Sequence, residues 1–227
     1  MSEGGTGESR LFPTIIKKKP CERLELIMPL WLVIGGVSSG KSAWAEQFIM
    51  NTLNHHEVEY IATLDESAAS LSDSVLHQKL AQHRMRRPLA WTLWQEPDNP
   101  IGRIMELPET HDVLWDGVGP YISRYMLRHG RSTERKGYNN RDFAQGRPNP
   151  DQTMEEVWTE MLFRISQRKA DTVIVSEEAG LGLIPMERET YDFVRILGKF
   201  NQIASNYANG MIFVVAGLPL WLKGAPQ

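Results

Sequence analysis

An octapeptide that begins at Gly35 has the residue types and the spacing of a phosphate-binding loop. Its sequence, GGVSSGKS, fits the pattern GxxxxGKS and consists of Gly35, Gly36, Val37, Ser38, Ser39, Gly40, Lys41 and Ser42. Its glycines allow backbone N–H groups to turn toward a phosphate, Lys41 can reach the terminal phosphates of a nucleotide, and the Ser42 hydroxyl can ligate Mg²⁺. The octapeptide follows a predicted buried strand and opens a predicted helix, which favours phosphate binding over the alternative of an ordinary glycine-rich turn.

A second candidate magnesium ligand is Asp116, which ends the sequence VLWD at 113–116. A Mg²⁺ ion that bridges nucleotide phosphates usually takes an acid from the end of a neighbouring strand. Asp116 precedes Gly117, so a turn or helix-cap role for this carboxylate stays open as the alternative.

The segment from His83 to Trp91, HRMRRPLAW, concentrates a histidine, three arginines and a tryptophan in nine residues. His83 continues a helical stripe with Leu76 and Leu80, so a half-buried structural histidine is one interpretation. The adjacent arginines favour another, because cationic side chains at the end of a helix suit a triphosphate better than they suit packing.

Short β-rich runs alternate along the chain with longer stretches of helical period, which is typical of a mostly parallel sheet with helices on both faces. Strands are predicted at Leu30–Ile34, Val58–Thr63, Val113–Gly117, Thr172–Ser176 and Met211–Ala216. Helices are predicted at Lys41–Leu53, Asp73–Arg86, Ile122–Arg128, Thr153–Arg168 and Arg188–Asn206. The expected fold class is therefore α/β, with the phosphate-binding loop and Asp116 both at the ends of strands.

The composition fits one folded domain, because 41% of the 227 residues are hydrophobic and 23% are charged. A net charge of −3 leaves no basic excess to neutralise phosphates, so nucleic acid is not an expected partner. One cysteine and six histidines without metal-ligand spacing predict neither a disulfide nor a metal cage, which indicates a cytoplasmic protein. No signal peptide or membrane span is expected, since the longest apolar run, Gly210–Leu222, is short and interrupted.

The domain organisation follows from shifts in composition. Residues 1–29 are expected to form a flexible N-terminal extension, and residues 30–227 a single nucleotide-binding domain. Within it, residues 130–150 are rich in Gly, Asn, Arg and Pro and lack an apolar period, which predicts a surface loop insertion. A basic flap over an anionic substrate is the alternative interpretation of this stretch.

Taken in order, the motifs resemble those of the bifunctional adenosylcobinamide kinase and adenosylcobinamide-phosphate guanylyltransferase family of cobalamin biosynthesis. The resemblance spans Leu30 to Lys223. It rests on the loop at 35–42, YIAT at 60–63, HRxxRPxxW at 83–91, the strand-end acid at 116, EAGLGLIP at 178–185, GxxNQ at 198–202 and GxPxxxK at 217–223.

The resemblance implies a P-loop NTPase fold of the RecA-like type, assembly as a homotrimer, and an adenosylated corrinoid as substrate. It also implies two reactions. ATP or GTP phosphorylates adenosylcobinamide, and GTP then transfers GMP to adenosylcobinamide phosphate through a covalent GMP-histidine intermediate, giving adenosylcobinamide-GDP. His83 is the implied nucleophile and Lys41 the second catalytic residue, with Mg²⁺ on Ser42 and Asp116. Beyond the loop at 35–42, nucleotide contacts are implied for Ala62, Thr63, Leu64, Arg84, Met85, Arg86, Arg87, Gln95, Glu96 and Asp116.

The chain departs from the family pattern at several positions. Glu177 and Arg124 stand where the family usually has Asn, Val194 interrupts a Phe-Arg-Asp sequence, and Gln95 stands where an acid is expected. Two alternatives therefore stay open: a P-loop kinase of another small alcohol, and a diverged nucleotide-binding protein without catalysis. Retention of both Lys41 and His83 argues against the non-catalytic alternative, since a pure binding protein needs no nucleophile.

Overall fold

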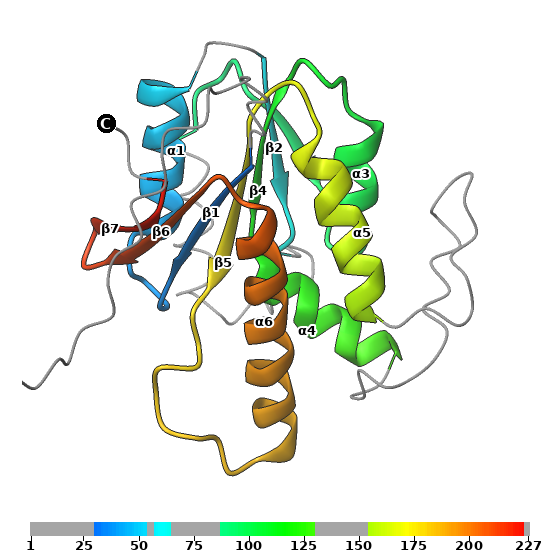
Figure 1. Ribbon diagram of the computed structural model, residues 1–227, viewed down its shortest axis with the longest axis vertical. Coiled ribbons are helices and arrows are strands. Elements are labelled where there is room, and N and C mark those ends of the chain that lie inside the picture. Colours follow the sequence, from blue (N-terminus) through cyan, green and yellow to red (C-terminus); the bar gives the residue numbers. More distant parts are fainter. Residues whose placement is uncertain (1–29, 54–56, 65–86, 130–153, 225–227) are drawn as a thin grey trace, which may run out of the picture.

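A seven-stranded sheet forms the centre of the computed structural model, which describes residues 30–53, 57–64, 87–129 and 154–224 (Figure 1). The strands are β1 (Leu30–Gly35), β2 (Val58–Ala62), β3 (Thr92–Gln95), β4 (Asp112–Asp116), β5 (Thr172–Glu177), β6 (Gly210–Val215) and β7 (Leu218–Lys223). Their order across the sheet is β3-β2-β4-β5-β1-β6-β7, and only the β6–β7 pair is antiparallel. The predicted mostly parallel α/β sheet is confirmed.

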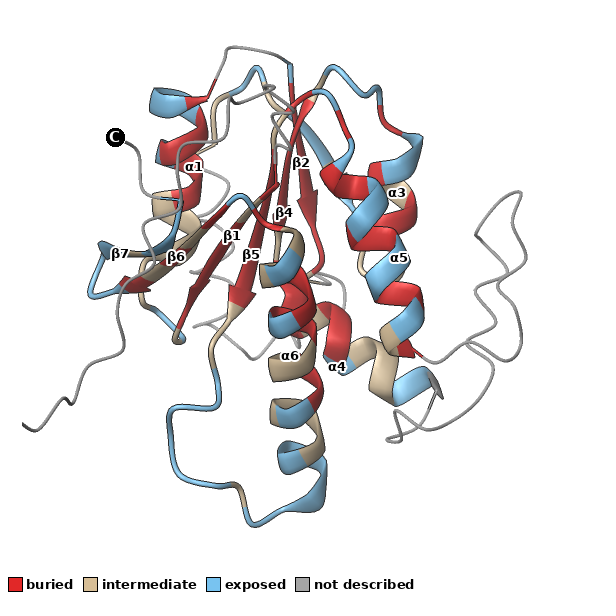
Figure 2. Ribbon diagram, in the orientation of Figure 1, coloured by how far each residue is buried: buried red, intermediate tan, exposed pale blue. Residues whose placement is uncertain are grey.

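Helices cover both faces of this sheet, as the sequence pattern predicts. The described helices are α1 (Lys41–Thr52), α3 (Pro100–Glu106), α4 (Val118–His129), α5 (Met154–Ser166) and α6 (Arg188–Tyr207). Helix α1 packs on one face through Ala45, Phe48 and Ile49, and α3, α4, α5 and α6 pack on the other around Trp158 and Phe200 (Figures 1 and 2). Among the described helices, one face of the sheet is therefore covered by α1 and the other by α3, α4, α5 and α6, which buries most of the central strands.

The inner strands form where the sequence is continuously apolar. In β1, β4 and β5, side chains on both faces are buried under helices (Figure 2). A strand covered on both sides needs no polar alternation, which explains the unbroken apolar runs LWLVI in β1, VLW in β4 and VIV in β5. This burial fixes the register of the strands and therefore the positions of the residues that end them.

The predicted boundaries agree closely with the structure. All five predicted strands are present, each shifted by at most one residue at either end. The helix predicted at Ile122–Arg128 begins four residues earlier, at Val118, because Gly117 with a φ of 107° ends the strand and lets the helix start directly.

Three described elements were missing from the sequence-based prediction. β3 has only four residues, mostly exposed, and α3 has only seven, so neither offers a clear period. A signal for α3 exists, since Asn99 accepts a hydrogen bond from Gly102 N and Pro100 occupies the first helical position. β7 takes up the end of the apolar run 210–222, which folds back at Ala216 and Gly217, both with positive φ.

Three of the predicted segments are not tested by the structure. The helix predicted at Asp73–Arg86, the extension at 1–29 and the loop at 130–150 lie outside the described residues. None of the described helices combines the length and the apolar character needed to cross a membrane.

Candidate nucleotide site at the carboxyl edge of the sheet

The octapeptide 35–42 joins β1 to α1 as a tight loop. The Ser39 N–H donates to Gly36 O at 3.2 Å and the Trp44 N–H donates to Gly40 O at 2.9 Å, which starts the helix. Gly40 has a φ of 89°, and a Cβ there would lie 3.1 Å from Gly217 Cα, so both conformation and space favour glycine. The loop therefore has the strand-loop-helix geometry that directs backbone N–H groups at a phosphate.

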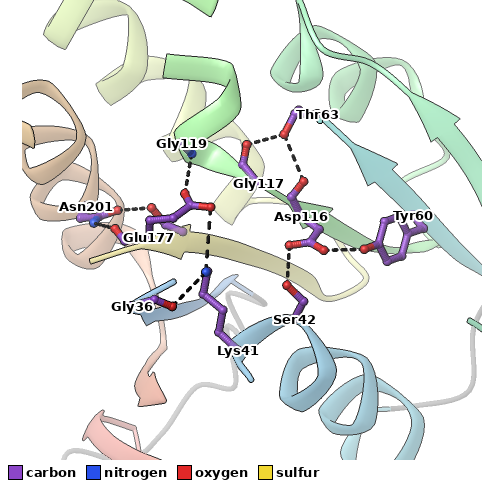
Figure 3. A network of polar contacts seen from close by, with 11 residues as sticks. Gly36, Lys41, Ser42, Tyr60, Thr63, Asp116, Gly117, Gly119, Glu177 and Asn201 are labelled. Atoms are coloured by element: carbon purple, nitrogen blue, oxygen red, sulfur yellow. Dashed lines mark hydrogen bonds and ion pairs between the residues drawn. The ribbon is translucent and has the colours of Figure 1, made fainter. Parts of the chain in front are cut away.

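The Lys41 side chain folds back over this loop. Its Nζ donates to Gly36 O at 3.3 Å and lies 4.0 Å from Glu177 Oε1, with 11% of the side chain exposed (Figure 3). The ammonium group is thus held over the loop, at the position from which it can reach the terminal phosphates of a nucleotide.

Asp116, at the end of β4, lies beside the start of α1. Its Oδ1 accepts a hydrogen bond from Ser42 Oγ at 3.0 Å, and its Oδ2 accepts one from Tyr60 Oη at 2.5 Å (Figure 3). Burial, and then the Asp116 charge, raise the pKa of Tyr60 well above its ordinary value, so the phenol stays a donor. The two predicted magnesium ligands are therefore adjacent, on two elements 74 residues apart.

The turn after β2 is fastened to the end of β4. Thr63 Oγ1 lies 3.0 Å from Asp116 O and hydrogen bonds to Gly117 O, and the Thr63 N–H donates to Asp116 O at 3.3 Å. Ala62 is buried and Leu64 is half-buried. The predicted contacts at 62–64 thus lie next to the candidate magnesium ligand.

The end of β5 places Glu177 opposite Lys41. Glu177 pairs with Gly35 in the register of β5 and β1, and its Oε2 accepts the Gly119 N–H at 2.6 Å. Asn201 on α6 donates to Glu177 O at 3.0 Å. Burial raises the pKa of Glu177, while the Lys41 charge and the Gly119 hydrogen bond oppose the rise.

Only the last arginine of the predicted histidine segment is described. The Arg87 guanidinium lies 3.8 Å from the centre of the Tyr60 ring, and its buried Nε has no hydrogen-bond partner among the described residues. His83, Arg84, Met85 and Arg86 lie outside the described residues. Arg87 therefore reaches the same edge of the sheet as Asp116, through the tyrosine that both contact.

The predicted contacts after β3 have local partners. Gln95 is exposed at the end of β3, and the Glu96 N–H donates to Ala62 O at 2.9 Å. Glu96 Oε1 accepts the Asn99 N–H at 3.0 Å, and Oε2 lies 3.8 Å from Arg103. Glu96 is thus near the site, with its carboxylate turned to the start of α3.

Two of the family departures also have clear positions. Arg124 on α4 pairs through Nε with Asp98 at 2.5 Å, which ties α4 to the loop after β3. Val194 is half-buried on α6.

Sequence reasoning missed the roles of Tyr60 and Glu177. A signal for Glu177 was present, because it follows a predicted strand directly, whereas Tyr60 lies in the middle of another. Parallel strands end at one edge of a sheet, so such residues converge. Their direct contacts with Asp116 and Lys41 depend on the strand order, which sequence spacing does not supply.

The assembled edge can bind a nucleotide and polarise its phosphates. It combines a glycine-rich loop at a helix N-terminus, one ammonium group, a hydroxyl-carboxylate pair and a second carboxylate opposite the ammonium group (Figure 3). The loop and lysine attract phosphate oxygens, and the oxygen pair offers hard ligands to a divalent cation.

Comparison with known proteins gives one family and several relatives. The family described as "Cobinamide kinase / cobinamide phosphate guanyltransferase" matches residues 31–222. The bifunctional adenosylcobalamin biosynthesis protein CobP of Pseudomonas aeruginosa is 28% identical over 196 residues, covering 86% of this chain and 98% of the relative. The bifunctional adenosylcobalamin biosynthesis protein CobU of Escherichia coli is 29% identical over 203 residues, covering 85% and 98%. Among solved structures, the flagellar accessory protein FlaH from Methanocaldococcus jannaschii has a TM-score of 0.42 at 16% identity, covering 88% of this chain and 82% of that chain.

Proposed function

This chain belongs to the cobinamide kinase / cobinamide phosphate guanyltransferase family, and we propose that one nucleotide site at the carboxyl edge of its sheet serves both reactions. The chain is a transferase of adenosylcobalamin biosynthesis. It phosphorylates adenosylcobinamide with ATP or GTP, and it then transfers GMP from GTP to adenosylcobinamide phosphate. The alternatives of another alcohol kinase or a non-catalytic nucleotide-binding protein are not favoured. The relatives are named bifunctional biosynthesis proteins, and this chain matches 98% of the length of each.

The observation that carries the one-site proposal is the convergence of Lys41, Ser42 and Asp116. Ser42 Oγ and Asp116 Oδ1 lie 3.0 Å apart, and Lys41 stands over the same loop. In the kinase reaction the loop N–H groups and Lys41 hold the β- and γ-phosphates. The γ-phosphorus is then positioned for attack by the acceptor hydroxyl, opposite the bond to the leaving nucleoside diphosphate.

Mg²⁺ belongs to this proposal. The donor set fits, because a hydroxyl and a carboxylate oxygen meet at hydrogen-bond distance and are the hard ligands that Mg²⁺ prefers. Ser42 and Asp116 would hold the ion, which neutralises charge on the phosphates when bound. Tyr60 fixes the second Asp116 oxygen, so the carboxylate keeps one orientation.

The guanylyltransferase reaction needs a nucleophile for the α-phosphorus of GTP, and His83 takes this role. A neutral imidazole can attack without prior deprotonation, forming an N–P bond while the bond to pyrophosphate breaks. Arg87, four residues later in the chain, contacts Tyr60, and four residues of chain span at most about 14 Å. This tether supports an attack by His83 on a nucleotide bound at 35–42, with Arg84, Arg86 and Arg87 next to the departing pyrophosphate.

The finer parts of the proposal follow from the family resemblance. They are the contacts of residues 62–64, Met85, Gln95 and Glu96 with the nucleotide, assembly as a homotrimer, and a cytoplasmic location.

The experiment that tests the proposal is a labelling assay with purified protein. α-Labelled GTP should leave a GMP label that is stable in alkali and lost in acid, as expected for a phosphorus–nitrogen bond, and γ-labelled GTP should leave none. His83→Asn should abolish the label and the guanylyl transfer while phosphorylation of adenosylcobinamide persists.

The matched control is His111→Asn. His111 lies at the opposite edge of the sheet, against Glu57 and Glu59, and its replacement should leave the label intact. A label that survives in His83→Asn would exclude His83 as the nucleophile, and absence of any phosphorylation by the wild type would exclude the kinase reaction.

A further inference from the structure

The carboxylate of Glu177 is held at one position beside the phosphate-binding loop. Its Oε2 accepts the N–H of Gly119, the second residue of α4, at 2.6 Å, and its own backbone carbonyl accepts Asn201 Nδ2 at 3.0 Å (Figure 3). A Cβ on Gly119 would lie 2.4 Å from Oε2, so any larger residue there would displace the carboxylate. The N-terminus of α4 therefore fixes the carboxylate, and α6 fixes the backbone of the residue that carries it.

The other oxygen of this carboxylate faces the site. Oε1 lies 4.0 Å from Lys41 Nζ, and 22% of the Glu177 side chain is exposed, so a ligand above the loop can reach it. The proposed nucleotide function needs Lys41 at the terminal phosphate. With a nucleotide bound in this way, Oε1 would border the γ-phosphate.

A negative carboxylate next to a γ-phosphate costs electrostatic energy, which the Lys41 ammonium group 4.0 Å away reduces and protonation of the carboxylate removes. Ser42 and Asp116 already provide the oxygen pair for the cation, and Glu177 is not hydrogen bonded to either of them in the described contacts. Burial raises the pKa of Glu177, which makes it a stronger base than an exposed carboxylate. A carboxylate at this position repels a phosphate, so phosphate binding alone does not explain Glu177.

We propose that Glu177 is the general base of the kinase reaction, accepting the proton of the acceptor hydroxyl on Oε1 as this hydroxyl attacks the γ-phosphate. This inference rests on the proposed function and is specific to this chain, because the family usually has Asn at the position of Glu177. A new bond forms between the acceptor oxygen and the γ-phosphorus, and the bond from the γ-phosphorus to the bridging oxygen of the donor breaks. The nucleoside diphosphate leaves with that electron pair, and Glu177 later releases its proton to water.

Glu177→Gln tests the proposal with the fold preserved, because a glutamine Oε1 can still accept the Gly119 N–H. Phosphorylation of adenosylcobinamide should lose about 100-fold or more in kcat with little change in the KM for ATP. The wild-type kcat should fall as the pH drops through the pKa of Glu177, and the variant should lack this dependence. GMP labelling from α-labelled GTP should continue at the wild-type rate, since it takes place at the α-phosphate.

Two further variants complete the experiment. Gly119→Ala should displace the carboxylate and lower phosphorylation in the same selective way, whereas Glu187→Gln, an exposed glutamate at the start of α6, should leave both activities unchanged.

Three results would overturn the proposal. They are a wild-type kcat and pH profile in Glu177→Gln, an unchanged kcat with a lowered KM for ATP, and an equal loss of phosphorylation and GMP labelling. The second result would identify Glu177 as a competitor of the phosphate, and the third would reduce it to a structural group. If the wild type phosphorylates nothing, the proposed function itself fails and this inference with it.

Discussion

Asp116 is the residue through which three segments of the chain meet. It accepts hydrogen bonds from Ser42 on α1 and from Tyr60 on β2, and Tyr60 in turn stacks under Arg87. One carboxylate therefore connects the phosphate-binding loop to the end of the histidine segment. A change in its charge should affect the site more than the fold.

Asp116→Asn should raise the Mg²⁺ concentration needed for half-maximal phosphorylation by about 10- to 100-fold, because one charged ligand oxygen is lost. The thermal melting curve should stay close to that of the wild type. A titration of activity against Mg²⁺ measures the effect, with Glu160→Gln on the exposed side of α5 as the control. Wild-type magnesium dependence in Asp116→Asn would support a turn role for this acid.

Glu177 gives a prediction for stability against pH. Its pKa is raised in the folded state, so between the unfolded and the folded pKa the native protein binds more protons than the unfolded chain. The contribution of this group is fully present below the unfolded pKa and is lost as the pH rises through the folded pKa. Glu177→Gln should therefore melt at a higher temperature than the wild type at neutral pH, and the difference should shrink toward pH 4.

Melting curves at a series of pH values test this sign directly. A wild type that gains stability over Glu177→Gln as the pH rises would show that the Lys41 ion pair outweighs burial. A gain in stability together with a loss of phosphorylation would be the trade-off expected where a buried charge serves chemistry.

The sequence predicted the positions of single residues where a motif carried them, and their roles in binding stay predictions. Lys41, Ser42 and Asp116 converge as their positions after strands predict. Tyr60 and Glu177 could not be assigned in this way, because their partners are set by the side-by-side placement of β2 with β4 and of β5 with β1. That placement depends on the packing of the whole sheet.

At the scale of elements, the turn of the β6–β7 hairpin packs directly against the phosphate-binding loop. Its turn donates the Gly217 N–H to Ser39 O at 2.8 Å, and Gly217 lies against Gly40. β7 is held in place by Trp221, whose ring lies 6.0 Å from Trp44 and 6.0 Å from Phe48, both on α1. An aromatic cluster thus positions the turn that touches the loop.

Trp221→Ala should destabilise the protein by about 2 kcal/mol, since a half-buried indole leaves a partial cavity. It should also weaken the binding of ATP measured by calorimetry below the melting temperature, because the turn at Gly217 is no longer held against the loop. Leu220→Ala, at an exposed neighbour on the same strand, should change stability by less than about 0.5 kcal/mol and leave binding unchanged. If Trp221→Ala lost stability but kept its affinity for ATP, the hairpin would not contribute to nucleotide binding.

The elements that sequence reasoning missed are those whose formation depends on neighbours. β3 is a short, exposed edge strand that exists because β2 offers it a partner, and β7 exists because β6 does. The buried strands were predictable, because coverage on both faces requires apolar residues throughout.

At the scale of the whole molecule, one surface is unusually apolar. The connection between β5 and α6 carries four large apolar side chains that are at least three-quarters exposed: Leu181, Leu183, Ile184 and Met186. This connection extends away from the sheet, beside the outer end of α6 (Figures 1 and 2). Apolar groups gathered in this way typically contact a partner, and the proposed homotrimer offers one.

We expect light scattering after gel filtration to give the mass of a trimer for the wild type. Leu183→Ser combined with Ile184→Ser should shift this mass to that of a monomer, since it removes apolar area from the contact. Leu127→Ser, at an exposed position on α4, should keep the trimer. A trimeric mass for the double variant would place the interface elsewhere.

The position of β1 has a consequence for how the protein is made. β1 is the first described strand, and its partners are β5 and β6, so its pairing begins only with residue 172. In the loop that follows β1, Ser39 O accepts a hydrogen bond from the Gly217 N–H, which lies far later in the sequence. During translation, the nucleotide site therefore forms only after Gly217 has been added, and non-local pairing of this kind forms slowly. A chain that the ribosome releases early carries the entire phosphate-binding sequence but not the site.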